Sequence, residues 1–70
     1  MKNEKAKEIK TNQNFRVMCE HKEDNIRWVE ATFTMLNDAT NYAIERNKKV
    51  QTPYNRIVEQ KINGSWYNVY

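Results

Sequence analysis

The sequence predicts an α+β domain in which one helix packs on one face of a four-stranded antiparallel sheet, in the chain order ββαββ. Apolar residues alternate through 15–33, recur with helical spacing through 36–50, and flank an Asn-Gly dipeptide at 63–64. At 70 residues the chain has room for one domain with a thin core. We therefore expect a single domain over 14–70, preceded by an arm at 1–13.

The arm is predicted to be flexible. Residues 1–13 contain three apolar residues and show no strand-like alternation, while four lysines and two glutamates give them a charge of +2. The alternative is a short exposed helix in which Glu4 and Glu8 face neighbouring lysines.

Two strands and a polar loop form the first predicted hairpin. In the first strand, Phe15, Val17 and Cys19 alternate with Arg16, Met18 and Glu20. Residues 21–25 are polar and suit a hairpin loop. In the second strand, Val29, Ala31 and Phe33 alternate with Trp28, Glu30 and Thr32. Strict alternation puts Val29 towards the helix and Trp28 away from it.

A helix follows, because the spacing of apolar residues changes to 3.6. The residues predicted to share its apolar face are Leu36, Ala39, Tyr42, Ala43 and Val50. Thr34 or Asn37 is expected to cap its start, the basic run 46–49 suits its last turn, and Thr52-Pro53 should stop it.

The second hairpin is predicted from Asn63-Gly64, which supplies the two positive φ angles of a type I′ turn. Counting outward from this turn pairs Ile62 with Ser65, Lys61 with Trp66, Gln60 with Tyr67, Glu59 with Asn68, Val58 with Val69, and Ile57 with Tyr70.

The sheet face without a helix is the predicted binding surface. Its members are expected to be Trp28, Trp66, Tyr70, Arg16, Met18 and Ile57. The helix-covered face is expected to hold Phe15, Val17, Val29, Ala31, Phe33, Val58, Tyr67 and Val69. An exposed patch that contains three aromatic side chains is typical of an interface. The structural alternative is that these aromatics cap sheet edges, pack on one another or lie under the arm.

A protein partner or self-association as a dimer is the preferred function for that surface. The alternative is a single-stranded nucleic-acid platform, in which the aromatics stack bases beside Arg16, Arg27 and Lys61. Residues 14–70 carry eight basic and seven acidic side chains, so they lack the excess of positive charge that phosphate binding needs. The charge balance favours the protein partner.

Catalysis, metal binding and a cofactor are not expected. Cys19, His21 and Glu23 share a strand face, but no tight nucleophile turn accompanies them. One cysteine and one histidine are also too few to supply the four ligands of a structural zinc site. The only glycine is Gly64, which excludes the glycine-rich phosphate-binding loops.

The compartment is predicted to be cytoplasmic. No run of apolar residues approaches the length of a membrane span, and the first ten residues have charges where a signal peptide has its apolar region. A single cysteine also gives no disulfide framework. The sequon Asn63-Gly64-Ser65 is interpreted as a turn.

In its pattern the chain resembles the small sheet-and-helix accessory proteins of tailed phages. The resemblance covers residues 14–70, through Leu36-Asn-Asp-Ala-Thr-Asn-Tyr-Ala43, Tyr54-Asn-Arg-Ile-Val58 and Asn63-Gly-Ser-Trp66. It implies a protein that binds and modulates a host factor in the host cytoplasm, for example by inhibiting a defence enzyme or altering transcription.

Overall fold

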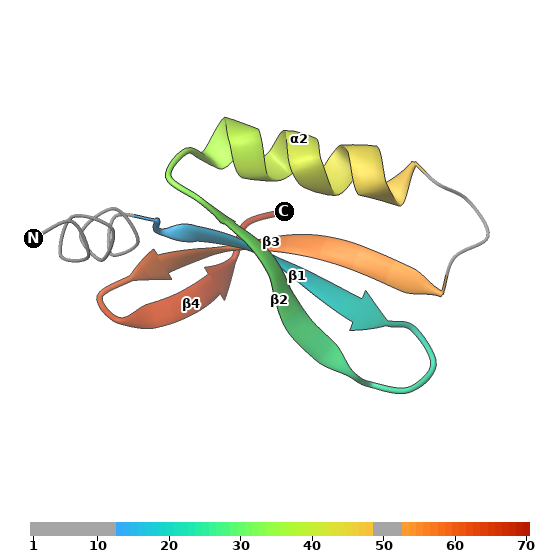
Figure 1. Cartoon of the computed structure of the whole chain (residues 1–70). Helices are drawn as coiled ribbons and strands as arrows, with labels where there is room; N and C mark the ends of the chain where they lie inside the picture. Colours follow the sequence, from blue (N-terminus) through green and yellow to red (C-terminus); the bar gives the residue numbers. More distant parts are fainter. Residues whose placement is uncertain (1–12, 49–52) are drawn as a thin grey trace, which may run out of the picture.

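The computed structural model describes residues 13–48 and 53–70 and confirms the ββαββ architecture. The elements are β1 (Phe15–His21), β2 (Arg27–Phe33), α2 (Leu36–Asn47), β3 (Tyr54–Ile62) and β4 (Ser65–Asn68). The strands form one antiparallel sheet in the order β2-β1-β3-β4, and α2 lies across one side of it (Figure 1). We call this side the helix face and the other side the open face. The predicted arm, apart from Gln13, lies outside the described residues.

The core lies where α2 crosses the two central strands. Val17 of β1 pairs with Ala31 on one side and Val58 on the other. Val17 and Val58 pack against Ala39 and Ala43 of α2, and all four are fully buried. Phe15, Phe33 and Tyr42 surround this cluster. The two alanines let the helix approach the sheet closely. The burial of Ala39 and Ala43 confirms the centre of the predicted apolar face of the helix.

The start of α2 lacks the predicted side-chain cap. The N-cap residue is Met35, whose backbone is extended and which makes no side-chain capping hydrogen bond. The prediction that Thr34 or Asn37 caps the helix was therefore wrong. Asp38 lies in the first turn, where its negative charge complements the helix dipole.

The end of α2 is tied to the sheet by a side-chain amide. Asn47 Nδ2 donates to the Arg56 carbonyl oxygen at 3.0 Å, and the Arg56 N–H donates to Asn47 Oδ1 at 2.9 Å. Arg46 lies in the last turn, as predicted. Val50 and Thr52 lie outside the described residues. No helix in the described part of the chain is long and apolar enough to cross a membrane.

The second hairpin has the predicted turn and register. The φ angles of Asn63 and Gly64 are 52° and 83°, as a type I′ turn requires. The pairs run as counted from Ile62–Ser65 to Glu59–Asn68. Beyond Asn68 the strand ends, because Val69 and Tyr70 both donate their N–H groups to the Val58 carbonyl oxygen, at 2.8 and 3.3 Å. The predicted pairing of Ile57 with Tyr70 was therefore wrong.

We expect Gly64→Ala to lower the free energy of unfolding by about 1 kcal/mol, because a Cβ atom is disfavoured at this positive φ. Nothing lies within 4 Å of the added Cβ atom, so the cost comes from the backbone conformation alone. Urea denaturation measures it. Ser65→Ala, at a residue with ordinary φ beside the turn, is the control and should change stability by less than about 0.5 kcal/mol. Equal effects of the two substitutions would contradict this role for Gly64.

A β-bulge interrupts the first hairpin and reverses the faces of part of β2. Val17 pairs with Ala31, but the next residue, Met18, pairs with Val29, so Glu30 is the extra residue on β2. From there Val29 shares the open face with Met18, and Trp28 shares the helix face with Cys19. The predictions that Val29 lies under the helix and that Trp28 lies on the open face were wrong.

Candidate functional site

Four of the six predicted binding residues lie on the open face. Met18 pairs with Ile57, Arg16 pairs with Glu59, and Trp66 pairs with Lys61, all at positions that alternate with the core residues. Trp28 lies on the helix face because of the bulge. The structure therefore brings Arg16, Met18, Ile57 and Trp66 to one face and separates Trp28 and Tyr70 from them.

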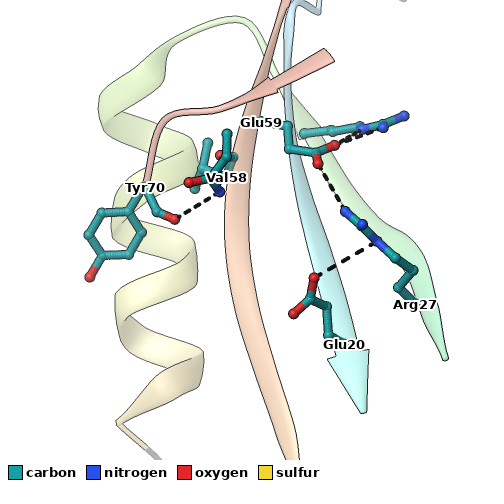
Figure 2. A network of polar contacts seen from close by, with 7 residues as sticks. Glu20, Arg27, Val58, Glu59 and Tyr70 are labelled. Carbon is teal, nitrogen blue, oxygen red and sulfur yellow. Dashed lines mark hydrogen bonds and ion pairs between the residues drawn. The ribbon is translucent and has the colours of Figure 1, made fainter. Parts of the chain in front are cut away.

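Tyr70 lies on the helix side of the sheet. In Figure 1 the C-terminus turns from the sheet towards α2. In Figure 2 the Tyr70 ring and the helix lie on one side of β3, and Glu59, Arg27 and Glu20 lie on the other. The prediction that Tyr70 belongs to the open face was wrong, because the chain leaves the regular register after Asn68.

The open face is covered by ion pairs and not by an aromatic patch. Glu59 is only 8 % exposed and accepts hydrogen bonds from Arg16 Nε at 2.7 Å and Arg27 Nη2 at 2.9 Å (Figure 2). Arg27 Nε also lies 3.9 Å from Glu20 Oε2. Because these charges are satisfied within the chain, a partner on this face would have to compete with existing ion pairs.

The remaining open-face residues offer little free apolar surface. Met18 is 6 % exposed between Val29 and Ile57. The Arg16 guanidinium carbon lies 4.0 Å from the centre of the Trp66 ring, which is a close cation–π contact. One face of this indole is therefore already occupied. The predicted open-face platform of three aromatic rings is reduced to Trp66.

Trp28 belongs to a separate aromatic cluster at the end of the sheet near the first loop. Its ring meets Tyr54 edge to face, with centroids 5.8 Å apart, and Tyr54 meets His21 in the same manner at 5.3 Å. Trp28 is 41 % exposed. This cluster was missed, since it depends on the bulge and on the pairing of His21 with Tyr54 across β1 and β3.

Glu30, the bulge residue, connects the sheet to the helix. Its carboxylate accepts hydrogen bonds from Arg56 Nε at 2.8 Å and from the Tyr42 hydroxyl at 3.1 Å, and Arg46 lies 4.0 Å away. The hydrogen bond from Arg56 is the main cause that lowers the pKa of Glu30. Burial, together with the Glu30 contact, raises the pKa of the Tyr42 hydroxyl. These contacts connect β2 with β3 and α2, which is a structural role.

The Cys19–His21 pair is not arranged as a nucleophile with its base. Cys19 is buried, and this burial raises the pKa of its thiol, which keeps the thiol in its less reactive protonated form. His21 Nδ1 accepts N–H groups of Glu23 and Asp24 at 3.3 and 3.2 Å, so it shapes the loop. Within the described ranges, no group of three or more His, Cys, Asp or Glu side chains could hold a metal ion.

A second set of exposed apolar residues lies in β4 and next to it in the chain and the sheet. In the described part of the chain, α2 contacts β1, β2 and β3 but not β4. A helix is about 10 Å wide and strands are about 4.8 Å apart, so one helix cannot cover four strands. The exposed apolar residues in this region, which we call the β4 surface, are Ile62, Tyr67, Val69 and Tyr70.

Among the described residues, the β4 surface adjoins a sheet edge that pairs with no further strand. Ile62, which pairs with Ser65, and Tyr67, which pairs with Gln60, both lie on the helix face. β4 is the last strand of the sheet, and Trp66 and Asn68 direct their backbone N–H and C=O groups away from β3. Residues 65–70 carry no charged side chain. That absence of charge was the signal in the sequence that could have identified this edge.

The charges of the described residues are balanced and largely paired. There are seven basic and seven acidic side chains among them, and each of the four arginines contacts a glutamate. This pairing of charges disfavours nucleic-acid binding, because a phosphate-binding face needs cations that are not paired with carboxylates. Comparison of the chain with protein-family models, with curated proteins and with solved structures gives no significant match.

Proposed function

We propose that this protein is a non-catalytic binding protein that contacts a protein partner through the β4 surface and the adjoining strand edge. The observation that supports the proposal most is the gathering of exposed apolar side chains beside an uncharged edge that α2 leaves uncovered. Strand edges of this kind bind other chains through backbone hydrogen bonds, and neighbouring side chains add apolar contact.

A protein partner is favoured over nucleic acid by the charges. Tyr67 and Tyr70 could stack on bases, but residues 65–70 contain no lysine or arginine to hold the phosphates beside them. Lys61, the nearest basic residue of the hairpin, pairs with Trp66 and so projects to the open face. An uncharged, partly aromatic surface is the composition that protein interfaces favour.

The resemblance to phage accessory proteins suggests what such binding would achieve. On that expectation the partner is a host protein in the cytoplasm, and occupation of its surface inhibits or modulates it. A small domain that presents an exposed apolar contact surface suits this role.

The proposal predicts that Tyr67→Ser removes partner binding. Tyr67 is 53 % exposed and outside the core, so the substitution removes contact area while leaving the fold intact. The loss should exceed about tenfold in affinity, as for an interface aromatic. The measurement is affinity capture from lysate by the tagged full chain, with bound proteins quantified by mass spectrometry and nuclease treatment in parallel.

The matched control for this experiment is Ile26→Ser. Ile26 is 54 % exposed, like Tyr67, but it lies in the loop before β2, at the opposite edge of the sheet. Capture should be unchanged in this variant. Equal loss in both variants, or no loss in either, would contradict binding through the β4 surface. Capture that disappears on nuclease treatment would favour the nucleic-acid alternative.

A further inference from the structure

We propose that the partner at the β4 surface is a second copy of this chain. This inference rests on the proposed function for its contact surface, and it takes a second copy of the chain, in place of a host protein, as the partner bound there. In the proposed dimer the two β4 strands lie antiparallel, with Tyr67 opposite Tyr67 of the second copy, so that two four-stranded sheets join into one. Each Trp66 then exchanges backbone hydrogen bonds with Asn68 of the second copy.

The register follows from which backbone groups point outward. Trp66 and Asn68 direct their N–H and C=O groups away from β3, whereas Tyr67 forms its hydrogen bonds with Gln60. Antiparallel pairing of two identical strands must have a twofold axis, and centring it at Tyr67 matches each outward donor with an outward acceptor. This arrangement is self-complementary, as an interface between identical subunits requires.

The absence of charge on β4 favours a second copy as the occupant. Residues 65–70 have no charged side chain, so two copies of this strand meet without repulsion between like side-chain charges. The other edge strand is different: β2 carries Arg27 and the Glu30 bulge. Charges and bulges keep many edges from pairing, and β4, although only four residues long, has neither at residues 65–68.

The thin core provides a physical reason for self-association. Among the described residues the buried hydrophobic side chains are Val17, Met18, Cys19, Ala39, Ala43 and Val58. Small domains with so little buried apolar area commonly gain stability by forming oligomers. The β4 surface consists of half-exposed side chains and is smaller than the roughly 800 Å² per partner of a standard interface. We therefore infer a dimer that dissociates on dilution.

A charge-exchange experiment tests both the dimer and its register. Tyr67→Lys places two like charges opposite each other at the twofold axis, and Tyr67→Glu does the same with the opposite sign. Each variant alone should show a dimer dissociation constant raised by more than about tenfold. An equimolar mixture of the two should restore association, because Lys then faces Glu. Sedimentation velocity of the full chain at concentrations up to about 1 mM measures this.

The outcomes separate this inference from the proposed function. Recovery of the dimer in the mixture supports the inference and also shows that both variants fold. A wild-type chain that sediments as a monomer up to about 1 mM overturns it. A wild-type dimer that both charged variants retain overturns the β4 register, and Ile26→Lys controls for an added surface charge. If the wild type is monomeric but Tyr67→Ser still abolishes capture of another protein, the proposed function stands and only the identity of the partner fails.

Discussion

Replacing Glu30 with glutamine is expected to lower the free energy of unfolding by about 2 kcal/mol at pH 7. The Glu30 carboxylate accepts charge-assisted hydrogen bonds from Arg56, and its side chain and that of Arg56 are 18 % and 14 % exposed. Glutamine keeps the shape and the bond from Tyr42 but loses the charge that offsets the guanidinium. Urea denaturation at pH 7 measures the effect.

The stability that the Glu30 carboxylate contributes is expected to depend on pH. The folded-state pKa of Glu30 lies below its ordinary value. The carboxylate therefore contributes stability that is fully present above that ordinary value and is lost as the pH falls through the folded-state pKa. The stability difference between wild type and Glu30→Gln should therefore shrink between pH 7 and pH 3. A difference that is constant over this range would contradict the role of the charge.

Glu45→Gln is the matched control for this prediction. Glu45 pairs with Lys48 at 3.4 Å, but both side chains are largely exposed. Exposed ion pairs of this kind contribute less than about 0.5 kcal/mol. A loss of stability in Glu45→Gln as large as that in Glu30→Gln would show that general charge effects, and not the contact between sheet and helix, cause both.

Val17→Ala is expected to lower the free energy of unfolding by about 2 to 3 kcal/mol. Val17 is fully buried on the central strand, against Val58, Ala39 and Ala43. Removing two methyl groups loses their burial and leaves a cavity, because the neighbouring alanines have no longer side chains to fill it. Chemical denaturation monitored by tryptophan fluorescence measures the effect.

Val29→Ala is the companion variant, and it tests the bulge. Val29 is 45 % exposed on the open face, so its truncation should cost less than about 1 kcal/mol. Uninterrupted alternation along β2 would place Val29 beneath the helix and give it a cost like that of Val17. Equal losses in the two variants would therefore contradict the bulged register.

Local patterns were enough to predict the elements of this fold. Asn63-Gly64 determined the turn and the register of the second hairpin through Asn68, since both depend on backbone angles within a few residues. The helical spacing of Ala39, Tyr42 and Ala43 likewise identified the helix face that meets the sheet. These features could be predicted because the residues that cause them are close in the sequence.

The bulge could not be predicted in this way. The alternation of Val29, Ala31 and Phe33 is regular, and Glu30 interrupts it in the structure. The partner that holds the Glu30 carboxylate is Arg56, 26 residues further along the chain. A single extra residue exchanges the two faces of a strand, so the bulge at Glu30 moves Trp28 out of the predicted site.

The predicted placement on the open face was correct for Arg16 and Met18 of β1 and for Ile57 and Trp66 of the second hairpin. It missed Glu59, which is buried between Arg16 and Arg27. That arrangement needs β1 to lie between β2 and β3, and the sequence pattern does not specify the order of the strands. The ion pairs that cover the open face therefore became visible only with the topology.

The Glu30 bulge limits how far these sheets can grow. A strand that added to β2 would meet a kinked backbone, whereas an open, regular β2 would let each copy join the next head to tail. Such joining has no natural end and produces filaments. In the proposed dimer the two β4 edges pair with each other, and the bulge disfavours a further strand at β2, so the dimer is expected not to extend into filaments.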